Sequence, residues 1–353
     1  MSDSSDSPPT FACPVARTPG KRILLSHGGG GRMSRRLIHD VFHKHFRSSE
    51  LAREHDGAYL DLGSQKLAFT TDGFVVSPPF FPGGDIGSLA VHGTVNDLAA
   101  CGARARWMSA AFILEEGFSL ADLERIVESM ARAAAEAGVE LVAGDTKVVE
   151  HGKGDGIYIT TSGVGLLHAD PPPDPRTVQP GDVVILTGPI GLHGVAIMSL
   201  REGMTFESEL QSDSASLGEL VATVYRAGVR PRCLRDPTRG GVGATLSEIA
   251  EASRTGILLD EAAIPVPELV KGACEILGLD PLLVANEGKM LLLVAPGDEE
   301  ATLQALRSHP LGRAAVTIGR VQAEEPGRVL IRTALDSTHV LDIPAGEELP
   351  RIC

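Results

Sequence analysis

The segment ADPPPDPRTVQPGD, residues 169–182, divides this chain of 353 residues into two parts. Five of its fourteen residues are proline. Because proline lacks a backbone N–H and restricts its own φ angle, such a segment continues neither a helix nor an interior strand. With 43% hydrophobic residues, the chain has enough apolar material for two cores. We therefore expect an N-terminal domain over 21–168, a linker over 169–182 and a C-terminal domain over 183–335.

Strand-like and helix-like patterns alternate on both sides of this segment. The clearest helix begins at Ser119, with Asp122 as a capping partner, and ends at Gly138. Its apolar face holds Leu120, Leu123, Val127, Met130 and Ala134. Before the linker we expect strands at 67–76, 103–114, 139–143 and 156–167, and a helix at 88–100. After it we expect strands at 182–187, 257–259, 290–294, 315–321 and 329–332, helices at 193–201, 216–227 and 243–253, and two further helices. The pattern predicts two α/β domains of mixed α+β type.

The two ends of the chain differ from this pattern. Residues 1–20 are rich in Ser, Asp and Pro, and we expect a disordered leader. Residues 336–353 offer little to bury, which predicts a mobile tail. The opening MSDSSDSPPT is polar and acidic, unlike a secretory signal, and no run approaches 18 apolar residues. We therefore expect a cytoplasmic protein that does not cross a membrane.

Charge and cysteine content exclude several classes of protein. The formal net charge of −14, with no basic cluster, argues against binding to nucleic acid or to an anionic membrane. The five cysteines are odd in number, scattered and never spaced as C-x-x-C, so neither a disulfide framework nor a structural zinc site is expected. An acidic protein that binds a polyphosphate nucleotide would place Mg²⁺ between its carboxylates and the phosphates.

Five aspartates stand beside small residues in expected loops or at strand ends: Asp56, Asp72, Asp97, Asp145 and Asp236. Any one of them could be an ordinary turn residue. Together they favour a Mg²⁺ site, because hard oxygen ligands are what Mg²⁺ requires.

Two glycine-rich segments could approach a phosphate. The run of four glycines after His27 lacks the Lys and Ser/Thr of the Walker motif, which favours a hinge or a mobile lid over a nucleotide. Gly240 and Gly241 stand directly before an expected helix, where backbone N–H groups can bind an anion. A tight turn with close helix packing explains the second pair equally well.

Eight short motifs run along the chain to its last residue: HGGGGRMS at 27–34, TTDGF at 70–74, GTVNDLAACGA at 93–103, LVAGDTKVV at 141–149, GLHGVAIMSLREGM at 191–204, RDPTRGGV at 235–242, ANEGKM at 285–290 and PRIC at 350–353. In this order they resemble the HypE family of hydrogenase-maturation carbamoyl dehydratases. That family is grouped with aminoimidazole ribonucleotide synthetase, selenophosphate synthetase and thiamine monophosphate kinase. The resemblance implies two α/β domains of the aminoimidazole ribonucleotide synthetase type, the first one dimerising, with an ATP site formed across the homodimer.

The resemblance also implies a reaction and its residues. The family converts an S-carbamoyl group on the terminal cysteine, here Cys353, into an S-cyano group while ATP is hydrolysed, and the cyanide goes to the iron of [NiFe] hydrogenase. Glu287 then matches the base, and Lys147 the group that stabilises charge during phosphoryl transfer. ATP ligands are expected at Asp72, Asn96, Asp97, Asp145, Thr146, Gly240 and Gly241, and Mg²⁺ ligands at Asp56, Asp72, Asp97, Asp145 and Asp236. The implied partners are HypF as carbamoyl donor and a HypC–HypD complex as cyanide acceptor.

Other interpretations stay open at this point. Glu287 could be an exposed turn acid, Lys147 a surface counter-charge to Asp145, and Cys353 an unremarkable terminal residue. The chain could be a selenophosphate synthetase or a small-molecule kinase of the same group, or a scaffold without catalytic activity. The reactive cysteine of selenophosphate synthetases is missing from the glycine-rich loop, which holds His27 instead. Where the family has G-D-H-G, this chain has Leu192 in place of the acid, so His193 receives no catalytic role. The other cysteines, Cys13, Cys101, Cys233 and Cys274, are expected to be buried and inert.

Overall fold

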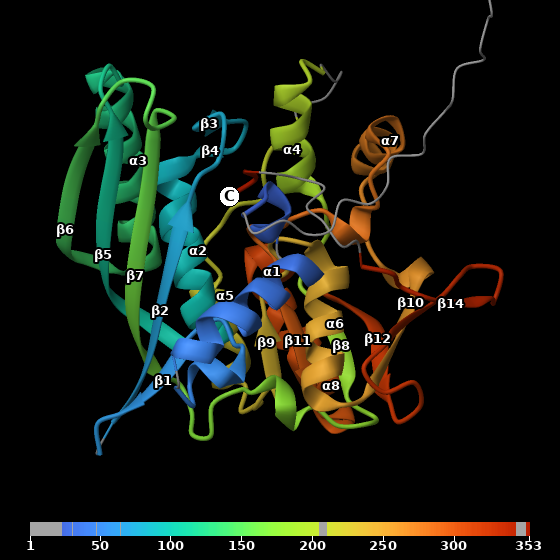
Figure 1. Cartoon of the computed structure of the whole chain (residues 1–353). Coiled ribbons are helices and arrows are strands. Elements are labelled where there is room, and N and C mark those ends of the chain that lie inside the picture. Colours follow the sequence, from blue (N-terminus) through green and yellow to red (C-terminus); the bar gives the residue numbers. More distant parts are fainter. Residues whose placement is uncertain (1–22, 30, 47, 64, 205–209, 344–350) are drawn as a thin grey trace, which may run out of the picture.

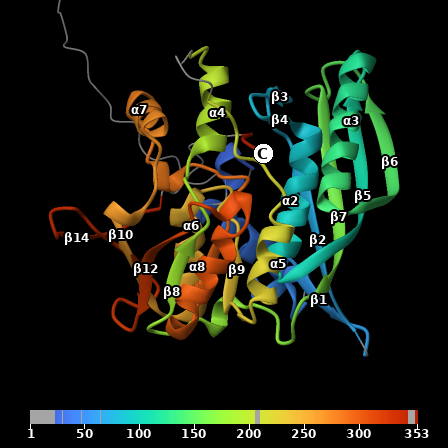
Figure 2. The same ribbon diagram turned by 180° about the vertical axis from the view of Figure 1, so that it is seen from behind.

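The structure, a computed structural model, describes residues 23–29, 31–46, 48–63, 65–204, 210–343 and 351–353. Two β-sheets with their helices lie side by side, and the C-terminus lies between the two halves (Figures 1 and 2). The expected leader over 1–20 and Cys13 lie outside the described residues, as does 344–350 of the expected tail. The domain boundaries at 168 and 183 stay predictions.

The N-terminal sheet has five strands in the order β1-β2-β7-β5-β6. Its strands are β1 (Ala58–Asp61), β2 (Lys66–Phe74), β5 (Ala103–Glu115), β6 (Glu140–Val149) and β7 (Ile157–Leu167). β5 and β6 pair in parallel, and the other neighbours pair antiparallel. Helices α2 (Ile86–Ala100) and α3 (Leu120–Ala137) lie on one face of this sheet, and among the described residues no helix covers the other face (Figures 1 and 2).

The C-terminal sheet has seven strands in the order β14-β13-β10-β12-β8-β11-β9. They are β8 (Val183–Leu186), β9 (Cys233–Arg235), β10 (Gly256–Asp260), β11 (Leu291–Val294), β12 (Val316–Gln322), β13 (Val329–Arg332) and β14 (Thr338–Val340). α6 (Gly241–Ser253) packs on one face, whereas α5 (Gly218–Arg226) and α8 (Glu299–Arg307) pack on the other. Burial on both faces explains why β8 and β11 are apolar throughout.

The remaining elements are short. The helices α4 (Leu192–Arg201) and α7 (Glu268–Leu277) stand at the upper edge of the C-terminal half in Figure 1. The other elements are α1 (Arg32–Leu37), the π-helix Ile38–His43, the hairpin strands β3 (Phe80–Phe81) and β4 (Gly84–Asp85), and 3₁₀ turns at Leu25–His27, Leu51–Arg53, Pro175–Thr177, Glu261–Ala263, Pro281–Leu283, Pro296–Asp298 and Pro310–Gly312. Within the described residues, no helix is both long enough and apolar enough to span a bilayer.

Most expected elements are confirmed where the local signal is strong. The hydroxyl of Ser119 accepts from the N–H of Asp122 at 3.3 Å, and Gly138 ends α3 in a left-handed conformation with φ of 66°. The strand expected at 139–143 is longer, because β6 continues to Val149. β1, β9 and β14 have four residues or fewer, and the sequence patterns did not predict them.

The proline-rich segment is tied to the N-terminal half. Asp174 accepts from the N–H of Arg176 at 2.9 Å and forms an ion pair with Arg53 at 2.8 Å. The hydroxyl of Tyr59 donates to the carbonyl of Pro173 at 2.6 Å. The segment therefore fixes the 3₁₀ turn at Leu51–Arg53 and the start of β1, which carry the loop of Asp56 between them.

Candidate active site

Three acids from separate segments converge between the two halves of the molecule. Asp56 precedes β1, Asp97 lies on α2 and Asp236 follows β9. One ligand oxygen from each lies within 4.8 Å of the others. The hydroxyl of Thr70, on the helix-covered face of β2, donates to Asp97 at 2.8 Å. The topology thus brings together carboxylates that are up to 180 positions apart in the sequence.

The three carboxylates of this cluster carry like charges and repel one another. Burial raises the pKa of Asp56 to about 8, against the opposing effect of Arg235. Burial likewise raises the pKa of Asp236 to about 6 and, together with the neighbouring acids, raises that of Asp97 well above its usual range. Oδ2 of Asp56 is buried without a hydrogen-bond partner among the described residues. Three crowded carboxylates with an unused oxygen fit a divalent cation such as Mg²⁺, which would remove the repulsion.

Asp72 lies beside this cluster. It is on β2, and its carboxylate accepts from the N–H of Gly73 at 2.7 Å. Burial raises its pKa, and its own charge raises the pKa of Asp97, Asp236 and Glu287. Of the five expected metal ligands, the structure therefore places three in one group and Asp72 next to them.

Asp145, the fifth expected ligand, lies elsewhere. It is on β6, the exposed edge strand, together with Thr146 and Lys147. Nζ of Lys147 lies 2.8 Å from the Asp145 carboxylate, and the hydrogen bond from this lysine lowers the pKa of Asp145. In register, Asp145 pairs with Ala111, and Lys147 pairs with Ile113, which is 41% exposed. Both side chains thus belong to the face without helices, so one chain alone does not bring them to the acid cluster.

Glu287 is buried and held by its main chain. Its N–H donates to Oδ1 of Asp213 at 3.2 Å, and its carbonyl accepts from Asn96 at 3.2 Å and from the N–H of Ala215 at 3.3 Å. The residue is 3% exposed, and Oε1 has no hydrogen-bond partner among the described residues. Burial, and then the charges of Asp236 and other acids, raise its pKa well above the usual range. The interpretation of Glu287 as an exposed turn acid is therefore wrong.

Asn96 connects the two halves of the molecule. Its amide nitrogen donates to the carbonyls of Ala215 and Glu287, and its Oδ1 accepts from the N–H of Leu217 at 2.8 Å. The side chain is 1% exposed. The expected contact between Asn96 and ATP stays a prediction, and the structure gives this residue a positioning task.

The glycines before α6 form a tight turn. Gly240 and Gly241 have φ angles of 77° and 63°, and the N–H of Gly241 donates to the carbonyl of Thr238 at 2.9 Å. A Cβ on Gly241 would lie 2.5 Å from the carbonyl oxygen of Leu282. Both observations favour close packing as the reason for this pair, and anion binding by it stays a prediction.

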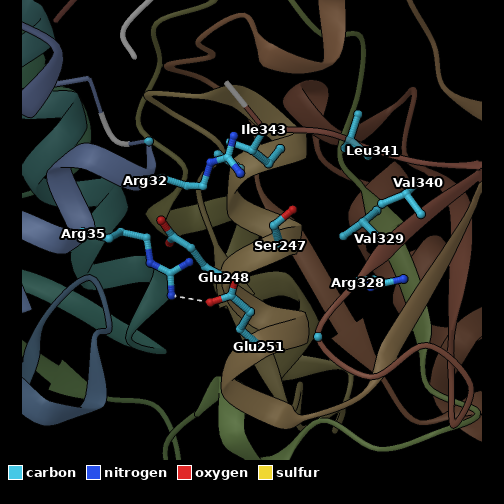
Figure 3. A pocket seen from close by; sticks show the side chains of 13 residues that line it. Arg32, Arg35, Ser247, Glu248, Glu251, Arg328, Val329, Val340, Leu341 and Ile343 are labelled. Atoms are coloured by element: carbon cyan, nitrogen blue, oxygen red, sulfur yellow. Dashed lines mark hydrogen bonds and ion pairs between the residues drawn. The ribbon is translucent and has the colours of Figure 1, made fainter. Parts of the chain in front are cut away.

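The segment after the first glycine run packs on α6. Here α1 and α6 enclose, with β13 and β14, a small cavity of about 140 Å³ (Figure 3). On its wall, Arg35 lies 2.6 Å from Glu251. A larger cavity of about 780 Å³ adjoins it and reaches Thr71, next to Asp72. Five arginines line this larger cavity: Arg35, Arg53, Arg176, Arg235 and Arg239.

The end of the chain is docked inside the molecule. The carbonyl of Cys353 accepts from the N–H of Val75 at 3.0 Å, and that of Arg351 accepts from the N–H of Ser77 at 3.3 Å, so residues 351–353 run antiparallel to the segment after β2. Ile352 and Cys353 are 2% and 8% exposed. The expectation that the tail has little to bury is wrong for these residues. The other described cysteines, Cys101, Cys233 and Cys274, are buried as expected.

Sequence reasoning missed several residues around this end. Nε2 of His193 lies 2.8 Å from the carbonyl oxygen of Ile352, and Arg201 donates to the carbonyls of Arg351 and Ser77. His193 and Arg201 stand in the motif GLHGVAIMSLREGM, which could have marked them. Asp213, which forms a buried ion pair with Lys289 at 2.9 Å, stands in the stretch QSDSAS and has no local signal.

Comparison with known proteins gives the family. Residues 54–167 match the N-terminal domain of AIR synthase related proteins, and residues 179–332 match their C-terminal domain. The carbamoyl dehydratase HypE of Azotobacter vinelandii is 53% identical over 331 residues, which cover 94% of this chain and 97% of that protein. A solved HypE in complex with ATP has a TM-score of 0.79 and 47% identity, and covers 94% of this chain and 100% of its own. A solved HypE–HypF complex has a TM-score of 0.82 and 44% identity, and covers 87% and 99%. The chain is thus built of two AIR synthase related domains and belongs to the HypE family of carbamoyl dehydratases.

Proposed function

We propose that this chain converts a carbamoyl group on the Cys353 thiol into a cyano group at the expense of ATP. The carbamoyl oxygen attacks the γ-phosphorus of ATP and ADP leaves, which turns a poor leaving group into phosphate. One nitrogen proton is removed as this intermediate forms, and the second is removed as the C–O bond breaks and C≡N forms. The products are S-cyanide, ADP and phosphate. The cyanide is destined for the iron of [NiFe] hydrogenase.

The nucleotide would occupy the cavity beside the acid cluster. Its volume of about 780 Å³ suits a nucleotide, and its five arginines outnumber the three glutamates of the same wall, Glu54, Glu248 and Glu251, which favours a polyphosphate. Asp56, Asp97 and Asp236 would hold Mg²⁺, with Asp72 at hand, and the bound ion would offset the charge of the phosphates.

Glu287 is the proposed base, and the observation that carries the proposal is its buried carboxylate, whose Oε1 has no hydrogen-bond partner among the described residues. Oε1 is buried, and the raised pKa brings the carboxylate closer to the basicity that proton abstraction at neutral pH needs. Its main chain is fixed through Asp213, whose neighbour Ser212 contacts the histidine that binds the docked tail. Tail and base are therefore held by hydrogen bonds that lead to two adjacent residues of one loop.

A second copy of the chain would complete the site. The face of the N-terminal sheet without helices exposes Phe69, Trp107 and Ile113, at 37%, 43% and 41%. Pairing two such faces would bury this apolar surface and bring Lys147 and Asp145 of one copy toward the acid cluster of the other. Lys147 would then stabilise the charge that develops on the transferred phosphoryl group.

Further parts of the proposal concern partners and location. A HypF-like carbamoyltransferase would load Cys353, and a HypC–HypD complex would accept the cyanide. The similar HypE–HypF complex supports the first partner. The tail would have to leave its docked position for both exchanges. A cytoplasmic location stays a prediction of the sequence.

The test is the mass of the C-terminal peptide. Chain carbamoylated on Cys353 and supplied with ATP and Mg²⁺ should lose about 18 Da, one water, as ADP forms. A Cys353→Ala variant should show no such loss. If the loss persists in that variant, or if ADP forms without it, the proposed function is wrong.

A further inference from the structure

The loop after α4 contacts the docked tail through a histidine. Oγ of Ser212 lies 2.7 Å from Nδ1 of His193, and Nε2 of the same ring lies 2.8 Å from the carbonyl oxygen of Ile352. A carbonyl oxygen only accepts, so Nε2 carries the proton and Nδ1 accepts from Ser212. His193 is fully buried, and burial lowers its pKa, which keeps the ring in this neutral form. Ser212 therefore fixes the tautomer that the tail requires.

The next residue of the same loop contacts the base. Oδ1 of Asp213 accepts from the N–H of Glu287 at 3.2 Å, and its carboxylate forms an ion pair with Lys289 at 2.9 Å. The side chains of Asp213 and Lys289 are 3% and 10% exposed. Nζ of Lys289 also donates to the carbonyl of Gly288 at 3.0 Å. Each member of this buried pair therefore makes one hydrogen bond to the backbone at Glu287 or Gly288, and the ion pair between them holds that backbone in place.

The two loops interlock at a glycine. A Cβ on Gly288 would lie 1.7 Å from the carbonyl oxygen of Asp213 and 3.4 Å from the nitrogen of Ala215. The N–H of Ala215 in turn donates to the carbonyl of Glu287 at 3.3 Å. The loop that carries Ser212 and Asp213 thus contacts the backbone on both sides of Glu287, so a movement of this loop would move that backbone.

We infer that Ser212 and Asp213 are positioning residues that fix the docked tail and Glu287 relative to each other. Ser212 acts on the tail through His193, and Asp213 acts on the base through its main-chain N–H. Because the two residues are adjacent, a shift of this loop moves both contacts together. The inference rests on the proposed function for the role of Glu287, whereas the contact with the tail stands without it.

The tail contact is tested by alkylation of Cys353 with iodoacetamide, followed by mass spectrometry of the C-terminal peptide of the full-length protein without nucleotide. Docking protects the thiol, so losing one hydrogen bond should speed its alkylation roughly 2- to 10-fold in Ser212→Ala. Ser212→Thr keeps the hydroxyl and should restore the slow rate. Ser214→Ala is the matched control, because that hydroxyl contacts His92 instead. Equal rates in wild type and Ser212→Ala would overturn this half of the inference.

The base contact is tested by turnover at saturating ATP. A misplaced base lowers kcat, so Asp213→Ala should lose roughly 10- to 100-fold in kcat while KM for ATP stays nearly constant. Asp213→Asn keeps an acceptor for the Glu287 N–H and should recover part of the loss. A kcat near the wild-type value, or a change in KM alone, would overturn this half. If wild-type protein itself makes no cyanide, the proposed function fails, and the alkylation result still decides the tail contact.

Discussion

Nε of Arg235 lies 2.7 Å from Oδ1 of Asp56, and the two side chains are 12% and 10% exposed. The guanidinium also lies 3.0 Å from the carboxylate of Glu248 on α6. The pair connects β9 of the C-terminal sheet to the loop before β1 of the N-terminal sheet. Arg235 is thus a fixed positive charge at the acid cluster, and it joins the two halves of the molecule.

Removing this charge should destabilise the fold. Above pH 8, where Asp56 is ionised, Arg235→Met leaves this carboxylate buried without its partner, a change that costs about 3 to 5 kcal/mol of unfolding free energy. Urea denaturation followed by circular dichroism measures the loss. Arg332→Met removes an exposed pair with Asp260, 47% and 40% exposed, and should cost less than about 1 kcal/mol. Similar losses in the two variants would contradict the structural role of Arg235.

The stability of the protein should depend on pH through Glu287. Its folded-state pKa is raised, so the folded state holds this proton more tightly than the unfolded chain. The resulting stabilisation is complete below the unfolded pKa of about 4.3 and is lost as the pH rises toward the folded pKa. Glu287→Gln imitates the protonated form. Without Mg²⁺, the unfolding free energy of this variant relative to that of wild type should therefore increase by at least about 1 kcal/mol between pH 5 and pH 8.

Urea denaturation at the two pH values measures this gain. Glu300→Gln is the control, because Glu300 is an exposed acid at the start of α8. A Glu287→Gln variant whose stability relative to wild type is the same at pH 5 and pH 8 would show that folding does not raise the pKa of Glu287.

The proposed shared site predicts complementation between two inactive variants. Lys147→Ala and Glu287→Gln should each abolish dehydration. In a mixed dimer, one of the two sites combines the intact Lys147 of one copy with the intact Glu287 of the other. After equal amounts are unfolded and refolded together, activity should reach about one quarter of the wild-type value, since half of the dimers are mixed and each has one good site.

The control for this experiment is the same mixture prepared with Trp107→Glu in both chains. Trp107 is 43% exposed on the face proposed to pair, and a charge there should prevent dimerisation and recovery of activity. Two results would refute a site that takes Lys147 from the second copy. One is activity that recovers although no dimers form, and the other is dimers of the two inactive variants that show no recovered activity.

Local signals in the sequence were sufficient for much of the fold. The helix from Ser119 to Gly138 has its cap and its glycine stop within twenty residues, and both are confirmed. Its expected apolar face is only partly right: Met130 and Ala134 are buried, whereas Leu120 and Val127 are 81% and 44% exposed. The bounds of α2, β2 and β7 lie within two residues of the expected ones. β9 and β14 were missed because strands of three residues are too short for an alternating pattern to show.

The candidate site was predictable only in part, because its contacts are not local. The sequence indicated that Asp56, Asp97 and Asp236 bind together, but only the pairing of strands brings them within reach of one another. Asp145 has the same kind of sequence surroundings and lies on an edge strand, which no pattern around it reveals. The docking of Ile352 and Cys353 depends on Val75 and His193, more than 150 positions away.

The wall of the cavity in Figure 3 includes α1, the segment after the glycine run, and we predict how firmly this helix is held. Arg35 holds α1 against α6 through Glu251, and the two side chains are 34% and 50% exposed. An exposed pair of this kind contributes up to about 1 kcal/mol, so Glu251→Gln should speed tryptic cleavage within α1 up to about fivefold. Glu268→Gln, which removes an exposed pair with Lys271 on α7, should leave cleavage unchanged. If this segment closes over the nucleotide, saturating ATP should slow cleavage in both variants and reduce the difference between them, because binding adds stability to the closed form. Cleavage that is insensitive to ATP in wild type and in Glu251→Gln would rule out a lid at this position.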